Sequence, residues 1–165
     1  MEALEALKTR RSIRAFRPVP VQQKQIEELV DCARLAASGR NEQPWEFVVV
    51  RDREKLHALG ELADHGKFIP QAAACIVVLC KPTKYFLEDG SAATENLLLA
   101  AHASGLGACW VAGDKKPYAG KVLELIGAPK DYKLISLVPV GHPAEDQGPR
   151  APKRSLSEVL HWDRF

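Results

Sequence analysis

The sequence predicts one layered domain in which a β-sheet carries helices on both faces, and two observations indicate it. Helix-like and strand-like patterns alternate along the 165 residues, which is typical of a sheet whose connections pack over it. One strand-like segment, residues 74–80, is apolar nearly throughout, as expected where both faces of a strand are covered. A chain of this length favours a single domain over residues 1–165, with enough chain to bury a sizeable core.

The N-terminal third of the chain predicts two helices followed by a strand. Residues 2–8 have apolar positions one helical turn apart and predict a short helix. Residues 22–37 repeat apolar positions at helical spacing and predict an amphipathic helix. Turn-forming residues then predict a polar loop over residues 38–44. β-Branched and aromatic residues predict a strand over residues 45–50.

The central third predicts two further helices around the buried strand. Asp52 is a suitable N-cap for a helix that extends to about Ala63. After the strand, residues 89–104 form a long helix that is apolar over most of its circumference. A helix that is apolar all round is covered on all sides, and in so small a chain a subunit interface provides that cover most easily. The pattern therefore predicts a homodimer.

The C-terminal third predicts the last elements of the sheet. Turn-favouring glycines precede a strand that is expected at residues 106–111. A helix is expected at residues 117–126, with a proline at its start. An apolar run predicts the last core strand at residues 132–140. A short helix is expected at residues 155–160, after a stretch rich in proline and charge.

Composition excludes several classes of protein. The chain is 46% hydrophobic and 27% charged with a net charge of +2, which is ordinary for a globular protein and argues against a nucleic-acid-coating surface. We see no apolar run long enough for a membrane span and no secretory signal, so a cytoplasmic protein is expected. The cysteines lack paired spacing and lie among apolar residues, which predicts four buried, reduced thiols. They are Cys32, Cys75, Cys80 and Cys109.

The most informative segment follows the first helix and combines three guanidinium groups with a hydroxyl. It contains Arg10, Arg11, Ser12 and Arg14 and ends at Phe16. Arginine donates pairs of parallel, charge-assisted hydrogen bonds that suit phosphate oxygens, and the serine adds a short donor among them. A basic run of this kind is also common on solvated surfaces, so the segment alone leaves both a phosphate site and a surface patch open.

Two other segments offer groups that a ligand ring would need. Ser38, Asn41 and Gln43 place a hydroxyl and two amides after a helix, either as a helix stop or as partners for the edge of a heteroaromatic ring. Gly107 and Gly113 flank a strand, where glycine serves either a tight turn or a close approach to a ligand. The order of the glycines does not match the dinucleotide-binding fingerprint.

The usual catalytic side-chain arrangements are absent from the sequence. The five histidines show no paired spacing for a metal, and no nucleophile elbow or P-loop occurs. No metal is therefore expected. A second basic pair, Lys153 and Arg154, lies near the C-terminus, where a solvated tail is the ordinary interpretation. Phosphate- and ring-binding groups without an acid, base or nucleophile indicate a protein whose chemistry belongs to a bound cofactor.

Five segments together resemble the FMN-dependent nitroreductase family. The resemblance spans nearly the whole chain, with the segments in the family's order and spacing. They are RRSIRAF, SGRNEQPWEF, ATENLLLAAHASGLGACWVAG, VPVGHP, and the late basic pair with SLSEVLHWDRF. Each segment alone is weakly specific, whereas five in register are highly specific.

The resemblance implies a role for each matching position. Arg10, Ser12 and Arg14 match residues that hold the FMN phosphate and ribityl chain, with Arg11 contributing backbone, and either Lys153 or Arg154 completes the phosphate site. Ala37, Ser38 and Gly39 match a loop that reaches the flavin from the partner subunit, and Asn41 and Gln43 lie near the flavin. Ala112 and Gly113 match the pair whose backbone N–H groups face flavin N5 and O4. Lys67 matches a position that contacts the pyrimidine edge in larger members.

The resemblance also implies a fold and an activity. The fold is α+β, a three-layer α/β/α arrangement with a mixed central sheet, in an intertwined homodimer where residues 155–165 form an arm on the partner. Hydride passes from NAD(P)H to flavin N5 and then to an electron-poor acceptor, such as a nitroaromatic compound or a quinone, by a ping-pong mechanism. The alternatives are a specialised enoate, aldehyde or dehalogenating reductase, a non-catalytic flavin carrier or sensor, and a generic anion- or nucleic-acid-binding patch.

Overall fold

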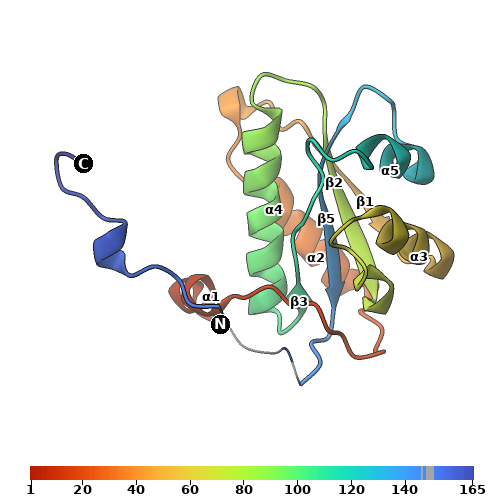
Figure 1. Ribbon diagram of the computed structural model, residues 1–165, viewed down its shortest axis with the longest axis horizontal. Coiled ribbons are helices and arrows are strands. Elements are labelled where there is room, and N and C mark those ends of the chain that lie inside the picture. The colour runs from red at the N-terminus through yellow and green to blue at the C-terminus, as the bar shows by residue number, and fades with distance from the viewer. Residues whose placement is uncertain (146, 148–150) are drawn as a thin grey trace.

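The computed structural model describes residues 1–145, 147 and 151–165, and these form the expected three layers. Helices α2 (Gln23–Arg34) and α4 (Phe86–Ala103) cover one face of the sheet. Helices α3 (Arg53–Leu62) and α5 (Ala119–Ile126) cover the other face (Figure 1). The expected α+β class with helices on both faces is therefore confirmed.

The sheet is built around two long central strands. Its order is β1 (Trp45–Val50), β2 (Ala74–Cys80), β5 (Lys133–Gly141) and β3 (Gly107–Ala108), and the short β4 (Val111–Ala112) also pairs with β5. Every residue of β2 is buried, as its apolar sequence predicts. Because side chains alternate across a strand, Ile76 and Val78 pack under α2 and α4, whereas Val77 and Leu79 pack under α3 and α5.

All the strand pairs formed by the described residues are antiparallel, whereas a mixed sheet was expected. Val50 pairs with Cys75, so the segment containing α3 leaves and re-enters the sheet at the same end. Cys80 likewise pairs with Lys133, although some fifty residues separate them in the sequence. The segment containing α4 does carry the chain back to the end where β2 begins, because Gly107 pairs with Gly141. β5 lies between β2 and β3 in the sheet, however, so these two strands of the same direction do not pair with each other.

Helix α4 is not fully covered by the described part of its own chain. Ala93, Leu97 and Ala101 face the core and are fully buried. Along its other side, Leu99 and Ala103 border a hollow of about 350 Å³ together with α1 (Ala3–Thr9). Full coverage of this helix, as the sequence predicts, therefore requires a further surface, and the dimer itself stays a prediction.

The main differences from the predicted elements lie in one strand and three helices. The strand expected at residues 106–111 is interrupted at Cys109 and Trp110, which leaves the two short strands β3 and β4. The helix expected to reach residue 37 ends at Arg34, and α4 begins three residues before the expected Asp89. The segment 155–160 contains one turn of 3₁₀ helix, η3 (Leu156–Glu158).

Candidate functional site

The arginine-bearing segment is an extended stretch that lies beside the end of the sheet. The Ile13 N–H donates to the Ala108 carbonyl at 2.9 Å, and the Arg17 N–H donates to the His142 carbonyl at 2.9 Å. Ile13 and Phe16 are each 8% exposed and anchor the segment by their apolar side chains. These anchors fix the backbone around Ile13, so its neighbours Ser12 and Arg14 are held in position.

Two glycines of the sheet make room for those anchors. A Cβ at Gly107 would lie 2.6 Å from Cγ2 of Ile13, and a Cβ at Gly141 would lie 2.9 Å from Cδ1 of Phe16. Any other residue at Gly107 would push the arginine segment outward. Close packing therefore explains Gly107, for which the sequence left a tight turn and a ligand contact open.

The arginine segment and the C-terminal stretch enclose a polar pocket of about 260 Å³. Four of its lining residues carry a positive charge, and Ser12 adds a hydroxyl. The pocket is lined by Arg10, Arg11, Ser12, Arg14, Gln147, Ala151 and Lys153. The structure thus brings together all four predicted residues of the arginine segment and one of the two late basic residues. A set of forked and single cationic donors of this kind fits a phosphate group.

The structure separates the two late basic residues. Lys153 lines the arginine pocket. The Arg154 guanidinium instead donates to the backbone carbonyl of Glu158, and the Glu158 side chain caps the same turn through Ser155. Of the two alternatives, Lys153 is the one that lines the pocket, and its contact with a phosphate stays a prediction.

One partner of the pocket had no signal in the sequence. The Gln147 side chain accepts from the Arg14 N–H at 3.3 Å and donates to the Ala15 carbonyl at 2.8 Å. The Arg11 guanidinium donates to the backbone carbonyl of Gln147 at 3.3 Å. Gln147 therefore fastens the arginine segment to the chain that follows β5. A single glutamine in a polar stretch has no motif, so only the structure identifies it.

A neutral thiol and a carboxylate border the arginine cluster. Burial raises the pKa of the Cys109 thiol, although Arg14, a hydrogen bond with Ser12 and Arg10 oppose the shift. The thiol is therefore protonated at neutral pH, and it leaves the positive charge of the pocket intact. Arg10 forms an ion pair with Glu95 of α4 at 3.1 Å, which orients its guanidinium.

The four cysteines are free, in agreement with the expected reduced state, but they are not equally buried. Cys75, Cys80 and Cys109 are buried, and burial raises the pKa of the Cys75 thiol to about 12. Cys32 is only partly buried and corrects the expectation of four buried thiols. It lies on α2 at the margin of the hollow between α1 and α4.

The polar loop that begins at Ser38 does not line the arginine pocket. Its Gly39 N–H donates to Asp89 near the start of α4, whereas the arginine cluster faces Glu95. These two carboxylates lie six positions apart on α4, which corresponds to about 9 Å along the helix axis. Ala37, Asn41 and Gln43 are exposed, and Ser38 is partly exposed. A single chain therefore builds the loop and the pocket as two separate features.

Gly113 is fixed by the sheet rather than free to meet a ligand. Its N–H donates to the Ile135 carbonyl at 3.0 Å, and a Cβ would lie 2.5 Å from Cγ of Leu134. The close approach to β5 therefore engages the Gly113 N–H, and the expected contact of Ala112 and Gly113 with a flavin stays a prediction. Ala112 is exposed, and its carbonyl accepts a hydrogen bond from the Tyr118 hydroxyl.

Lys67 is held by α3 and lies outside the arginine pocket. Its ammonium group donates to the Glu61 carbonyl at 3.1 Å and pairs with the Glu61 carboxylate at 3.5 Å. The loop expected around Lys67 contains a short 3₁₀ helix, η2 (Ile69–Gln71), before β2. A contact of Lys67 with a flavin stays a prediction.

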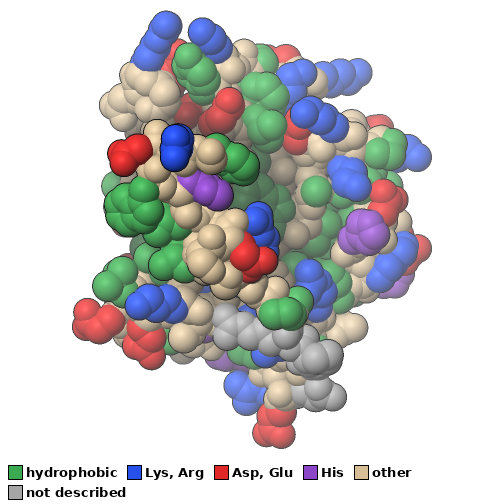
Figure 2. Space-filling model, turned by 60° about the vertical axis from the view of Figure 1, so that its left-hand side comes forward, with side chains coloured by type: hydrophobic (Ala, Val, Ile, Leu, Met, Phe, Trp, Pro, Cys, Tyr) green, Lys and Arg blue, Asp and Glu red, His purple; other side chains and the backbone are tan. Residues whose placement is uncertain are grey.

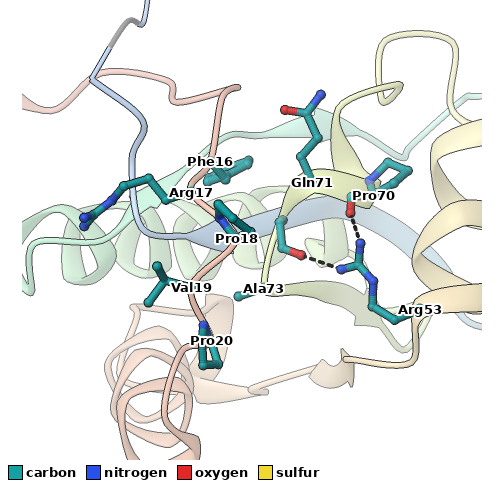
Figure 3. Close-up of a pocket in the computed structure, with 10 residues that line it drawn as sticks. Phe16, Arg17, Pro18, Val19, Pro20, Arg53, Pro70, Gln71 and Ala73 are labelled. Carbon is teal, nitrogen blue, oxygen red and sulfur yellow. Dashed lines mark hydrogen bonds between the residues drawn. The ribbon is translucent and has the colours of Figure 1, made fainter.

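A larger hollow of about 580 Å³ borders the same extended segment at residues 16–20, but its chemistry differs (Figure 3). Phe16, Pro18 and Pro70 give it largely apolar walls. The Arg53 guanidinium donates to the carbonyls of Ala72, at 3.2 Å, and Pro70, while Arg17 points away from the hollow. No free cation is thus directed into it from the labelled residues, and the smaller arginine pocket is the better anion site.

The described residues also lack two features that would indicate other classes of function. They contain no group of three or more His, Cys, Asp or Glu side chains arranged to hold a metal ion. None of the helices among them combines the length and the apolar character needed to cross a membrane.

Comparisons with known proteins identify the family and the fold. The profile described as the nitroreductase family matches residues 7–79 and 66–142. A relative from Archaeoglobus fulgidus, provisionally named an NADH dehydrogenase/NAD(P)H nitroreductase, is 40% identical over 153 residues, covering 88% of each chain. A solved structure from Bacteroides thetaiotaomicron with the same provisional name has a TM-score of 0.92 at 31% identity and covers 99% of this chain and 98% of that one.

A third similar protein was solved with a flavin. A structure from Desulfovibrio desulfuricans, provisionally named a nitroreductase and solved in complex with FMN, has a TM-score of 0.88 at 28% identity. It covers 100% of this chain and 98% of that one. The fold, the order of the five segments and these matches lead to one conclusion: this chain belongs to the nitroreductase family.

Proposed function

We propose that this protein is an FMN-dependent oxidoreductase that takes hydride from NAD(P)H and passes it to an electron-poor acceptor. The arginine pocket is the observation that carries this proposal, because it gathers Arg10, Arg14, Lys153 and Ser12 around a space of about 260 Å³. The printed names of two similar proteins, an NAD(P)H nitroreductase and a nitroreductase solved with FMN, support the choice of donor and cofactor.

The residues of the pocket bind and orient the phosphate end of the cofactor. Guanidinium groups of Arg10 and Arg14 donate paired hydrogen bonds to phosphate oxygens, Ser12 donates a shorter one, and Lys153 supplies a point charge. Bound FMN supplies a ring that accepts a hydride and releases it again. The pocket side chains hold fixed charges, so none of them needs to move a proton for the reaction to proceed.

The ring-binding half of the site is proposed to come from a second copy of the chain. The loop that contains Ser38, Asn41 and Gln43 is polar and accessible but lies away from the arginine pocket of its own chain. A two-fold dimer places the same surface of each copy against the other, so it can bring the loop of one copy to the pocket of its partner. The proposed functional unit is thus a homodimer of single-domain chains.

The C-terminal arm, residues 155–165, supports the dimer. All its residues are exposed, and the arm leads away from the body of the molecule (Figure 1). Trp162 is 79% exposed and Leu156 is 71% exposed, which is unfavourable for large apolar side chains in water. On the face turned forward in Figure 2, hydrophobic side chains also reach the surface between charged ones. We propose that the arm packs on the partner subunit.

The hydride donor NAD(P)H and the acceptor are proposed to bind at the same position, one after the other. This order of binding corresponds to a ping-pong mechanism. The acceptor is a small, electron-poor molecule such as a nitroaromatic compound or a quinone. The connection around residues 67–70 and the one between β2 and α4, at residues 81–85, are short, so they leave little room for long insertions that would cover a large substrate. The cytoplasm, where NAD(P)H is available, is the proposed location.

Flavin uptake and reduction test this function. Purified protein is expected to bind FMN, and its flavin absorbance is expected to bleach under anaerobic conditions when NADH or NADPH is added. A panel of nitroaromatic and quinone acceptors then identifies the substrate class from the steady-state oxidation of the donor. A protein that binds no FMN contradicts the proposal, and FMN that neither donor bleaches indicates a carrier or sensor instead.

A further inference from the structure

A buried carboxylate supports the polar loop from beneath. Asp89, in the first turn of α4, is only 4% exposed, and its Oδ1 accepts a hydrogen bond from the Gly39 N–H at 2.8 Å. Its Oδ2 is buried and has no hydrogen-bond partner among the described residues. Removing a carboxylate from water is unfavourable unless it is well paired. The contact with the loop therefore offsets part of the cost of burying this group.

The loop has a strained shape. Arg40, Asn41 and Gln43 have φ angles of 56°, 58° and 47°, in the left-handed region that residues with a Cβ rarely adopt. Such a backbone persists only where its surroundings determine it. The Gln43 N–H donates to Ser38 Oγ at 3.1 Å, but this bond joins two residues of the loop and does not attach it to the body.

The attachment comes from two residues of α4 that lie one turn apart. Asp89 holds the Gly39 N–H, and the ring of Tyr85, at the N-cap of α4, packs directly against Gly39. A Cβ at Gly39 would lie 2.6 Å from Cδ2 of Tyr85, so the loop backbone is pressed closely onto the helix. A polar and a steric contact thus fix the same residue of the loop.

The thiol of Cys80 is close enough to Asp89 for the two groups to interact electrostatically. Burial, followed by the charge of Asp89, raises the pKa of this thiol to about 12. Cys80 is therefore neutral, and it neither neutralises the carboxylate nor draws it away from Gly39.

We propose that Asp89 is a positioning residue that, through Gly39, holds the loop in the shape that presents its polar side chains to the FMN bound by a second copy of the chain. This inference rests on the proposed function, because the loop affects the flavin only if it contacts it. Asp89 itself touches neither cofactor nor substrate. Its effect is on the geometry of Ser38, Asn41 and Gln43.

The test compares Asp89→Ala with Glu88→Gln in the full-length dimer. Glu88 also lies in the first turn of α4 but is exposed, so its variant removes a helix-terminal charge without touching the loop. Affinity is measured for FMN and for riboflavin, which lacks the phosphate. Asp89→Ala is expected to weaken both by about tenfold, because the Gly39 N–H loses its partner and the loop loosens around the ring. Glu88→Gln is expected to match the wild type for both ligands.

A spectroscopic measurement separates positioning from general destabilisation. The visible circular dichroism of bound flavin reports the surroundings of the ring, and it is expected to change in Asp89→Ala but not in Glu88→Gln. Asp89→Asn keeps an acceptor oxygen without the charge, and neutral hydrogen bonds are about half as strong as charge-assisted ones. Its affinity is therefore expected to lie between those of the wild type and Asp89→Ala, at about threefold below the wild type.

The outcomes distinguish this inference from the proposed function. A wild-type protein that binds no FMN contradicts the proposed function and, with it, this inference. Normal FMN binding by the wild type, together with unchanged affinity and unchanged flavin spectra in Asp89→Ala, overturns the role of Asp89 alone. If Asp89→Ala does not fold, the FMN affinities of Asp89→Asn and Glu88→Gln are compared instead. Equal FMN affinities of these two variants overturn the role of Asp89.

Discussion

The arginine segment and the loop at Ser38–Gln43 are both short polar stretches, but one chain completes only the first of them. The arginine segment is fastened to β3 through Ile13 and to Gln147, and Lys153 lines the same pocket of about 260 Å³. The loop is fastened to the start of α4 through Gly39, and its amide side chains are exposed. The difference indicates which half of the cofactor site folds within a protomer and which half depends on assembly.

The arginine segment and the loop are also held in place by different kinds of contact. Apolar side chains and glycine gaps fix the arginine segment, whereas a buried carboxylate and a tyrosine ring fix the loop. The first set of anchors leaves the guanidinium groups directed into a pocket of the same chain. The second set leaves a strained loop whose function we assign to the partner. Four predictions test this division, and the first has the largest expected effect.

Arg14→Ala is expected to weaken FMN binding by about hundredfold, because a paired, charge-assisted contact with the phosphate is lost. The dimer is expected to persist, since the arginine segment keeps its apolar anchors. Fluorescence titration with FMN measures the first effect, and light scattering after gel filtration measures the second. Arg17→Ala is the matched control, because Arg17 lies in the same segment but does not line the pocket. Unchanged FMN affinity in Arg14→Ala would refute the phosphate assignment.

Lys153→Ala is expected to reduce FMN affinity by about tenfold, while Arg154→Ala leaves it unchanged, because single charged hydrogen bonds are weaker than paired ones. The two residues are neighbours, so each variant controls for the other. Salt dependence sharpens the comparison: the affinity of Lys153→Ala is expected to fall less steeply with ionic strength than that of the wild type. Equal losses in both variants would contradict the position of Lys153 in the pocket.

Gly107→Ala is expected to lower the free energy of unfolding by about 1–3 kcal/mol, because its Cβ overlaps Ile13. FMN affinity is expected to fall by a few fold as the arginine segment shifts outward. Gly120→Ala is the control, since a Cβ there meets open space on α5 and alanine favours a helix. Urea denaturation and FMN titration measure the two effects. A Gly107 variant as stable as wild type would show that the segment is not packed as described.

Asn41→Ala is expected to weaken FMN binding by about threefold in the dimer, as one neutral hydrogen bond is worth about 1 kcal/mol or less. The same substitution is expected to have no effect in a chain shortened after Arg154, which keeps the arginine pocket but loses the arm. The shortened chain is expected to be largely monomeric by light scattering. A threefold loss in that monomer as well would show that the loop acts on the FMN of its own chain.

The sequence predicted the elements well where the signal is local. The strands at residues 45–50 and 74–80 have the predicted bounds, and Asp52 caps α3 by accepting from the Lys55 N–H at 2.9 Å. The arginine residues and Ser12 were also identified, because charge and spacing are visible in adjacent positions. The C-terminal end of α2 was predicted less accurately, since small residues near Ala36 and Ala37 continue the apolar pattern after the helix has ended.

The order of the elements, the layered class and the concentration of cationic side chains in the arginine segment follow from the sequence alone, because periodicity and residue chemistry act between near neighbours. The tertiary structure decided which late cation enters the pocket, that Gln147 fastens it, and that Gly107 and Gly113 are required by packing. It also showed that the Gly113 N–H is occupied by Ile135. These features depend on segments far apart in the sequence approaching within a few ångströms, and only the folded chain determines which atoms then compete for the same space or hydrogen bond.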